Sequence, residues 1–123
     1  MKNLLTLIYS QLRTVADRVY IENVPSGITV QYPYVTYRIP TSIDDYQKQD
    51  FIVEIDIWDN KADNTAIEKL TDDIDAIFHR LHHYQEGVLQ VSMYRINRMM
   101  IPDPDPKIRR RQLRYQAKTY IGA

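Results

Sequence analysis

The sequence predicts an α+β fold, with a mostly antiparallel sheet of four to five strands and two helices packed on one face. Three observations lead to this prediction. Residues 51–60 largely alternate between apolar and polar side chains, which is typical of a strand with one packed face. Two other stretches repeat apolar residues every three or four positions, which indicates amphipathic helices. Near the C-terminus, two strand-like stretches are joined by a proline-rich loop, as in an antiparallel hairpin.

The first half of the chain is expected to begin with a helix and to continue as strands. Residues 3–18 carry an apolar stripe at helical spacing. Residues 19–21 form a short strand candidate, and the β-rich segment 33–40 is bracketed by prolines that limit a strand. The polar, acidic residues 41–49 are predicted to form a loop, and residues 50–59 the central strand.

The second helix is expected to begin near Thr65, where Thr65 and Glu68 fit a capping box. It is expected to run through about Tyr84, and Gly87 is the candidate stop at its C-terminus. Its apolar stripe consists of Ile67, Leu70, Ile74, Ile77, Phe78 and Leu81.

Two further strands are predicted to close the sheet. Residues 88–101 alternate imperfectly, and a bulge near Met93 and Tyr94 reconciles the two halves. Residues 102–106 contain three prolines, which lack the N–H that a central strand needs, so they are predicted to form a loop. Residues 108–121 form the last strand candidate. The side chains expected on one side of it are Leu113, Tyr115, Ala117, Thr119 and Ile121.

Length and composition limit the class of protein. A chain of 123 residues predicts one domain, 1–123. Because there are no cysteines, a disulfide framework, a thiol nucleophile and a cysteine zinc site are excluded, and an intracellular protein is the simplest interpretation. No signal-peptide pattern or membrane-length apolar run is present.

The net charge is zero, but the charges are segregated along the chain. Residues 41–86 contain four basic and twelve acidic residues, whereas residues 87–123 contain eight basic and two acidic ones. The two regions could pair within one fold or between copies, or the basic region could contact nucleic acid.

Two constellations invite a catalytic or metal-binding interpretation. His79 and His83 are four residues apart with His82 between them, but no third ligand is evident, so no metal or cofactor is predicted. Glu54 and Asp56, with nearby Asp59 and Lys61, are reminiscent of metal-dependent nucleases. However, the usual Glu-x-Lys pairing is absent, and ordinary positions on a sheet surface explain the carboxylates better. The chain is therefore not expected to be an enzyme.

A contact between copies is the preferred role for the charged residues. The acidic residues of the second helix are expected to be solvated or to face a partner, and the basic ones lie on the last strand. Trp58 falls on the less apolar side of its strand and is a candidate interface anchor. The residues predicted at a subunit interface are Arg109, Arg110, Arg111, Arg114, Glu68, Asp72, Asp73, Asp75 and Trp58.

The order of elements and several short motifs resemble a known family. These motifs are a Val-Pro-x-Gly turn at 24–27, Tyr-Pro-Tyr-Val at 32–35, Ile-x-Ile-Trp at 55–58 and Arg-x-Leu-Arg-Tyr at 111–115. Together with the acidic helix, they resemble the tail completion, or tail-to-head joining, proteins of long-tailed bacteriophages and prophages, which are related in fold to tail terminators. The resemblance spans nearly the whole chain.

The resemblance implies a structural protein of the virion tail that is not an enzyme. Such proteins form hexameric rings that cap the tail tube and join it to the head connector, and DNA passes through the centre. The implied partners are other copies of the chain, the tail tube protein and the connector or stopper protein, with no membrane and no sequence-specific DNA binding. The alternatives are another head–tail neck component, and a nucleic-acid-binding module or nuclease that uses the basic C-terminal strand.

Overall fold

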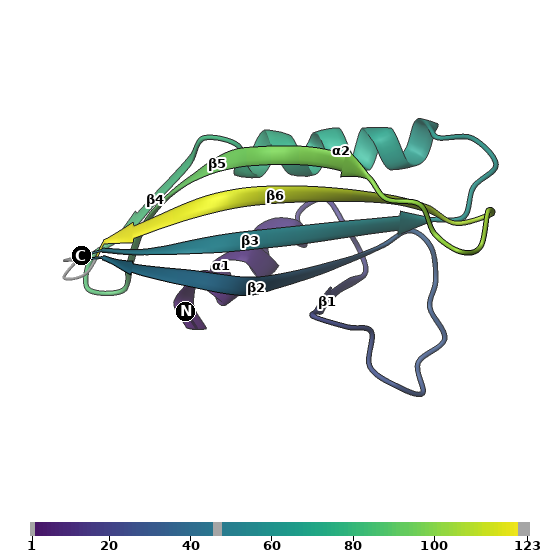
Figure 1. Ribbon diagram of the computed structural model, residues 1–123. Coiled ribbons are helices and arrows are strands. Elements are labelled where there is room, and N and C mark those ends of the chain that lie inside the picture. The colour runs from purple at the N-terminus through teal and green to yellow at the C-terminus, as the bar shows by residue number, and fades with distance from the viewer. Residues whose placement is uncertain (1, 46–47, 121–123) are drawn as a thin grey trace.

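The computed structural model describes residues 2–45 and 48–120. Within these residues the chain forms two helices and six strands (Figure 1). Ile121, predicted on the core side of the last strand, lies outside the described residues. The elements are α1 (Lys2–Leu12), β1 (Val19–Ile21), β2 (Tyr34–Asp45), β3 (Lys48–Asp59), α2 (Thr65–Phe78), β4 (Leu81–Gln85), β5 (Leu89–Met100) and β6 (Arg109–Tyr120).

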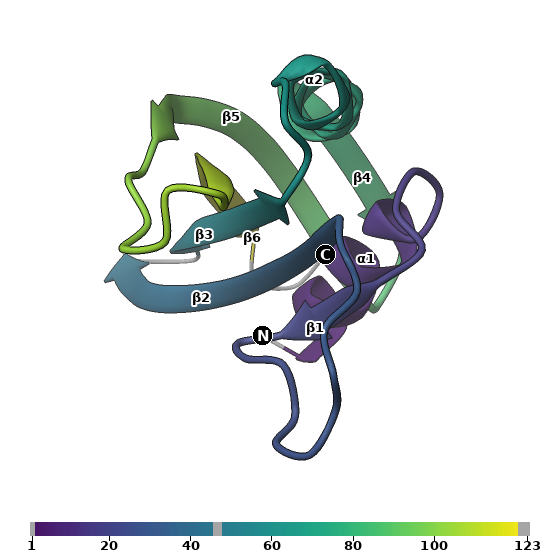
Figure 2. The same ribbon diagram turned by 90° about the vertical axis from the view of Figure 1, so that its right-hand side faces the viewer.

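The strands form one curled sheet in the order β1-β2-β3-β6-β5-β4 (Figure 2). β1 pairs with β2 in parallel, and the other four pairings are antiparallel. The predicted α+β class is thus confirmed. The sheet is larger than the four to five strands expected, because β4 was not anticipated, and β1 makes it mixed.

β3 is the central strand, as predicted. It pairs with β2 on one side and with β6 on the other, and its pairing with β6 runs without interruption from Lys48 to Asp59. Phe51, Val53 and Ile55 are almost fully buried, as is Ile57. The period-two pattern therefore identified the packed face correctly.

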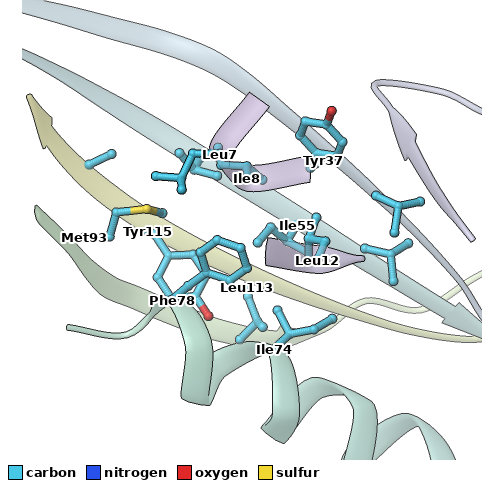
Figure 3. Close-up of a cluster of buried hydrophobic side chains, with 14 of the residues drawn as sticks. Leu7, Ile8, Leu12, Tyr37, Ile55, Ile74, Phe78, Met93, Leu113 and Tyr115 are labelled. Atoms are coloured by element: carbon cyan, nitrogen blue, oxygen red, sulfur yellow. The ribbon is translucent and has the colours of Figure 1, made fainter. Parts of the chain in front are cut away.

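Both helices cover this packed face, as predicted (Figure 3). Leu7, Ile8 and Leu12 of α1 approach Ile55 from one side, and α2 packs beside them. The ring of Phe78 lies 5.8 Å, centroid to centroid, from that of Tyr115. The fully or almost fully buried residues at the centre of the core are Leu4, Ile8, Leu12, Val35, Val53, Ile55, Ile57, Ile67, Ile74, Phe78, Met93, Leu113, Tyr115 and Ala117.

The loop predicted over residues 41–49 is wrong for most of its length. β2 continues through Asp45, and β3 already begins at Lys48, so a long hairpin replaces the loop. The register shifts between Arg38 and Thr41, around Pro40, which allows the strand to pass a residue without an N–H. Residues 41–44 are exposed, so no apolar alternation marks this part of the strand.

Both predicted helices are too long. α1 ends at Leu12, and α2 ends at Phe78, where His79 turns to an extended conformation with ψ 120°. Arg80 has φ 67° and donates its N–H to the Met93 carbonyl oxygen, which starts β4. Leu81 continues the helical spacing of the sequence, but it also fits a two-residue period, which is what the structure adopts.

The predicted helix caps and bulge also differ from the structure. Asn64, not Thr65, is the N-cap of α2, and the Glu68 side chain bonds to arginines instead of closing a capping box. Gly87, with φ 72°, lies in the β4–β5 turn rather than at a helix end. The bulge of β5 falls between Arg95 and Asn97, slightly beyond its predicted place.

Candidate interaction surfaces

The face of the sheet without helices carries a network of buried charges. Glu54 and Asp56 of β3 are only 8% and 5% exposed. Arg38 donates to Glu54 at 2.9 Å, and Arg110 donates to Asp56 at 3.0 Å. The Gln112 amide lies between the carboxylates and donates to both, at 3.3 and 3.2 Å. Each carboxylate therefore has cationic and amide partners within the sheet, as buried charges require.

These contacts do not form an open catalytic site. Asp59 is fully buried. Its Oδ1 lies 3.7 Å from Lys61 Nζ and accepts the Asn60 N–H. Among residues 2–45 and 48–120, no group of three or more His, Cys, Asp or Glu side chains could hold a metal ion. The carboxylates of Glu54 and Asp56 have structural partners instead, whereas Asp59 Oδ2 is buried with no hydrogen-bond partner among the described residues.

The acidic face of α2 contacts the basic strands of its own chain. Arg111 Nε donates to Glu68 Oε1 at 2.6 Å. Arg98 bridges two turns of the helix, because it donates to Glu68 at 2.7 Å and to Asp72 at 2.6 Å. The segregated charges thus meet within one chain, which is the first of the alternatives that the sequence leaves open.

The same pattern continues toward the end of α2. Arg95 donates to one oxygen of Asp75 at 2.6 Å, and the Tyr115 hydroxyl donates to the other at 2.7 Å. Burial, together with this hydrogen bond to an anion, raises the pKa of the Tyr115 hydroxyl. Asp73 lies on the exposed side of the helix and pairs with Lys69.

Replacing Glu68 with glutamine is expected to destabilise the protein at pH 7 and to have no effect in acid. The hydrogen bond from Arg111, with the charges of Arg111 and Arg98, holds the pKa of the Glu68 carboxyl below its usual value, although burial opposes this shift. Because this pKa is lower in the folded state, the ionised carboxylate stabilises the protein fully at a pH above the unfolded-state pKa of about 4.3. That stability is lost as the pH falls through the folded-state pKa.

Because Glu68 is 39% exposed, the expected difference at pH 7 is at most about 1 kcal/mol. Urea unfolding of both proteins at pH 7 and in acid measures it. A difference that persists unchanged below about pH 3 would contradict the assignment.

The other residues predicted at an interface also have partners in the chain. Arg109 donates to the carbonyl oxygens of Lys61 and Ala62, at 3.2 and 2.7 Å. The Trp58 ring stacks on that of Tyr34 with 4.9 Å between their centroids, and the guanidinium carbon of Arg110 lies 4.8 Å from the centroid of the Trp58 ring. The Arg114 guanidinium lies 3.8 Å from Glu54. Their role between copies stays a prediction.

The three histidines do not converge. His79 ends α2, and its Nδ1 accepts the Arg95 N–H at 3.0 Å. His82 lies on β4 with its Nδ1 2.9 Å from Ser92 Oγ, and His83 points to the opposite face of the strand. The helical i, i+4 relation that suggested paired ligands is therefore absent, because residues 81–85 form a strand.

The two edges of the sheet form a surface that the sequence analysis missed. In the described part of the chain, β1 pairs only with Val35–Tyr37 of β2, and β4 pairs only with Leu89–Met93 of β5. At Arg95 of β5 the backbone N–H is accepted by His79. Beyond Arg95 on β5 and beyond Tyr37 on β2, no described strand covers the edge, which is a template for another strand. The exposed apolar residues near these edges include Ile21, Ile43, Tyr84, Ile96, Met99 and Met100.

An apolar groove of about 440 Å³ adjoins β1, between α1 and the start of β2. Its walls are the side chains of Leu5, Tyr9, Ile21 and Tyr37, and Lys2 lies at its rim.

Of the described helices, neither is long and apolar enough to cross a membrane.

No family model and no curated protein matches the sequence. The fold does match solved structures. A chain of the virion of a native gene transfer agent particle superposes with a TM-score of 0.67 at 14% identity, over 92% of this chain and 91% of that one. A second solved structure, whose name states no function, superposes with a TM-score of 0.60 at 11% identity, over 98% and 95%. The protein therefore shares its fold with a chain found in a virion.

Proposed function

We propose that the protein is a structural component of a phage-like particle. The observation that carries this proposal is the match to a chain of a gene transfer agent virion over more than nine-tenths of both chains. The match supports a role in the particle, because it extends over nearly the whole of both chains rather than over one local motif. A non-enzymatic role agrees with the ion-paired carboxylates of β3.

Within such a particle, the proposed role is that of a tail completion protein. A ring of copies, six by family resemblance, caps the tail tube and joins it to the head connector, and DNA passes through the centre. The support is the resemblance of the motifs at 24–27, 32–35, 55–58 and 111–115. A ring also needs two different surfaces on each copy, and the two edges of this sheet differ.

Purified protein mixed with tail tubes is expected to form rings at one end of each tube in negative-stain images. Rings at the head vertex instead would identify another neck component. A protein that binds neither tubes nor heads at near-physiological salt would overturn the proposal. A monomer in the absence of tubes is compatible with it, because assembly then begins on the tube.

One observation favours a nucleic-acid-binding role as the second candidate. Lys61, Lys107 and Arg109 line one cavity of about 380 Å³ between the β3–α2 and β5–β6 loops. Duplex DNA binding with a steep salt dependence, weakened when Lys61 and Lys107 are both replaced by alanine, would support this candidate. Absence of binding at low salt would remove it.

A further inference from the structure

We propose that copies of this chain join through the two stepped edges of the sheet. β4 of one copy lies beside the uncovered part of β2 of the next. In the same contact, β1 of the next copy lies beside the uncovered part of β5 of the first. This inference rests on the proposed assembly of the protein as a ring and names the surfaces that would build it.

The strand register places the two steps at opposite ends of the strands. We call a row of residues that are register partners across the sheet a level. At one level, β1 covers the edge of β2, but the edge of β5 is uncovered in the described residues. The residues of this level are Val19, Val35, Ile57, Arg111 and Met100. At the other level, β4 covers β5, but the edge of β2 is uncovered. The residues of that level are Ser42, Phe51, Ala117, Met93 and Leu81.

One edge of the sheet therefore has an extra strand where the other edge lacks one. Two copies can therefore lie side by side without a shift along the strands. β4 of one copy then fills the notch of the next, which is the uncovered part of β2, and β1 of the next copy fills the corresponding notch beside β5. From the pairings, β4 runs parallel to β2, whereas β1 runs antiparallel to β5. Both orientations allow ladder hydrogen bonds to the backbone groups exposed at the notches.

Where β1 of one copy meets the uncovered part of β5 of the other, both copies present apolar side chains. Met100 is 73% exposed and lies on the helix-covered face, because it is the register partner of Arg111, whose guanidinium bonds to α2. On the neighbouring copy, that face presents Ile21, 47% exposed, at the groove beside α1. Burying Met100 in this groove would remove both apolar surfaces from water.

The second contact, between β4 and the uncovered part of β2, is apolar on the face without helices and polar on the helix-covered face. Ile43 and Tyr84, 54% and 62% exposed, both point to the face without helices, within diagonal reach of one another across the contact. Asp44 and His83 share one level and the helix-covered face, so the carboxylate of one copy would meet the imidazole of the next.

Cysteine crosslinking tests the contact directly, because the chain has no cysteine of its own. Ile43 and His82 share one level and one face, so I43C and H82C in one chain are expected to join neighbouring copies. Within one copy β3, β6 and β5 lie between the two positions. Four strand spacings, about 19 Å along the curled sheet, therefore separate them, whereas a disulfide spans at most about 7 Å between Cα atoms, so the bond is expected between copies.

On tail tubes under mild oxidation, the double variant is expected to give a ladder of covalent multimers that ends at the ring number. Each single variant gives dimers at most. The matched control combines H82C with D73C, since Asp73 is exposed and lies on α2, which is not one of the strands of the proposed contact. A ladder from the control at the same rate would show non-specific contact and would overturn the proposal.

A second variant, M100D, is expected to leave the thermal unfolding of the monomer unchanged and to lower the fraction of ring-capped tubes at least tenfold. The control is D72N with D73N, which removes two charges from the acidic helix and is expected to leave ring formation unchanged. If copies joined through the acidic helix instead, D72N with D73N would lower ring formation and M100D would not. Rings that form as readily with M100D as with the wild type, or rings of the I43C/H82C variant that give no ladder, would overturn the stepped contact but leave the proposed function intact. Failure of the wild-type protein to form rings would overturn both.

Discussion

Replacing Asp56 with alanine is expected to lower the free energy of unfolding by about 3 kcal/mol. The Asp56 carboxylate is 5% exposed and accepts hydrogen bonds from Arg110 and Gln112. Its removal leaves a guanidinium and an amide without their shared acceptor on a largely buried face. Urea denaturation of both proteins at pH 7 measures the loss.

Two control variants separate this effect from a general sensitivity to substitution. D56N keeps an oxygen acceptor and the side-chain volume, so it is expected to cost less than D56A. D73A removes an exposed carboxylate and is expected to stay within about 0.5 kcal/mol of the wild type. A D56A protein of unchanged stability that had lost a magnesium-dependent nuclease activity of the wild type would restore the enzyme interpretation.

Replacing Phe78 with alanine is expected to cost about 3–5 kcal/mol. Phe78 is the last residue of α2, is fully buried, and packs its ring against that of Tyr115 at 5.8 Å. The substitution removes the ring and leaves a cavity between the end of the helix and β6.

F78L keeps most of the volume and is expected to cost less than about 1.5 kcal/mol. Hydrogen exchange provides the local measurement, because the amides of α2 should lose protection more than those of β3. A loss of stability under 1 kcal/mol, or equal loss of protection across the sheet, would show that Phe78 does not hold α2 to the core.

The parts of the fold predicted correctly are those where burial imposes a period. β3 and the second half of β6 largely alternate between apolar and polar side chains because one face packs against the helices. α2 repeats its apolar residues because one stripe of it is packed. The end of β2 has no such signal, since residues 41–44 are exposed. β4 was merged into the preceding helix because Leu81 satisfies both periods.

The ion pairs could not be deduced from the charge distribution alone. Arg110 meets Asp56 only because β6 lies beside β3, and the order of strands is a property of the whole sheet. The same holds for Arg111 and Glu68, which are 43 residues apart in the sequence. Charge segregation singled out Arg111 and Glu68, which do pair. It missed Arg98 and Arg95, which bind Asp72 and Asp75. It also left open whether the pairs form within one chain or between copies.

The bulge at Pro40 has a consequence for how the protein behaves at high concentration. Pro40 offers no N–H, and the register shift beside it interrupts the pairing of β2 with β3, so this edge strand is irregular at that point. An unrelated extended peptide can therefore pair with only a few residues at a time, which is too short for a stable cross-β nucleus. A proline that merely bends one strand thus also protects an open-edged protein from fibrous aggregation.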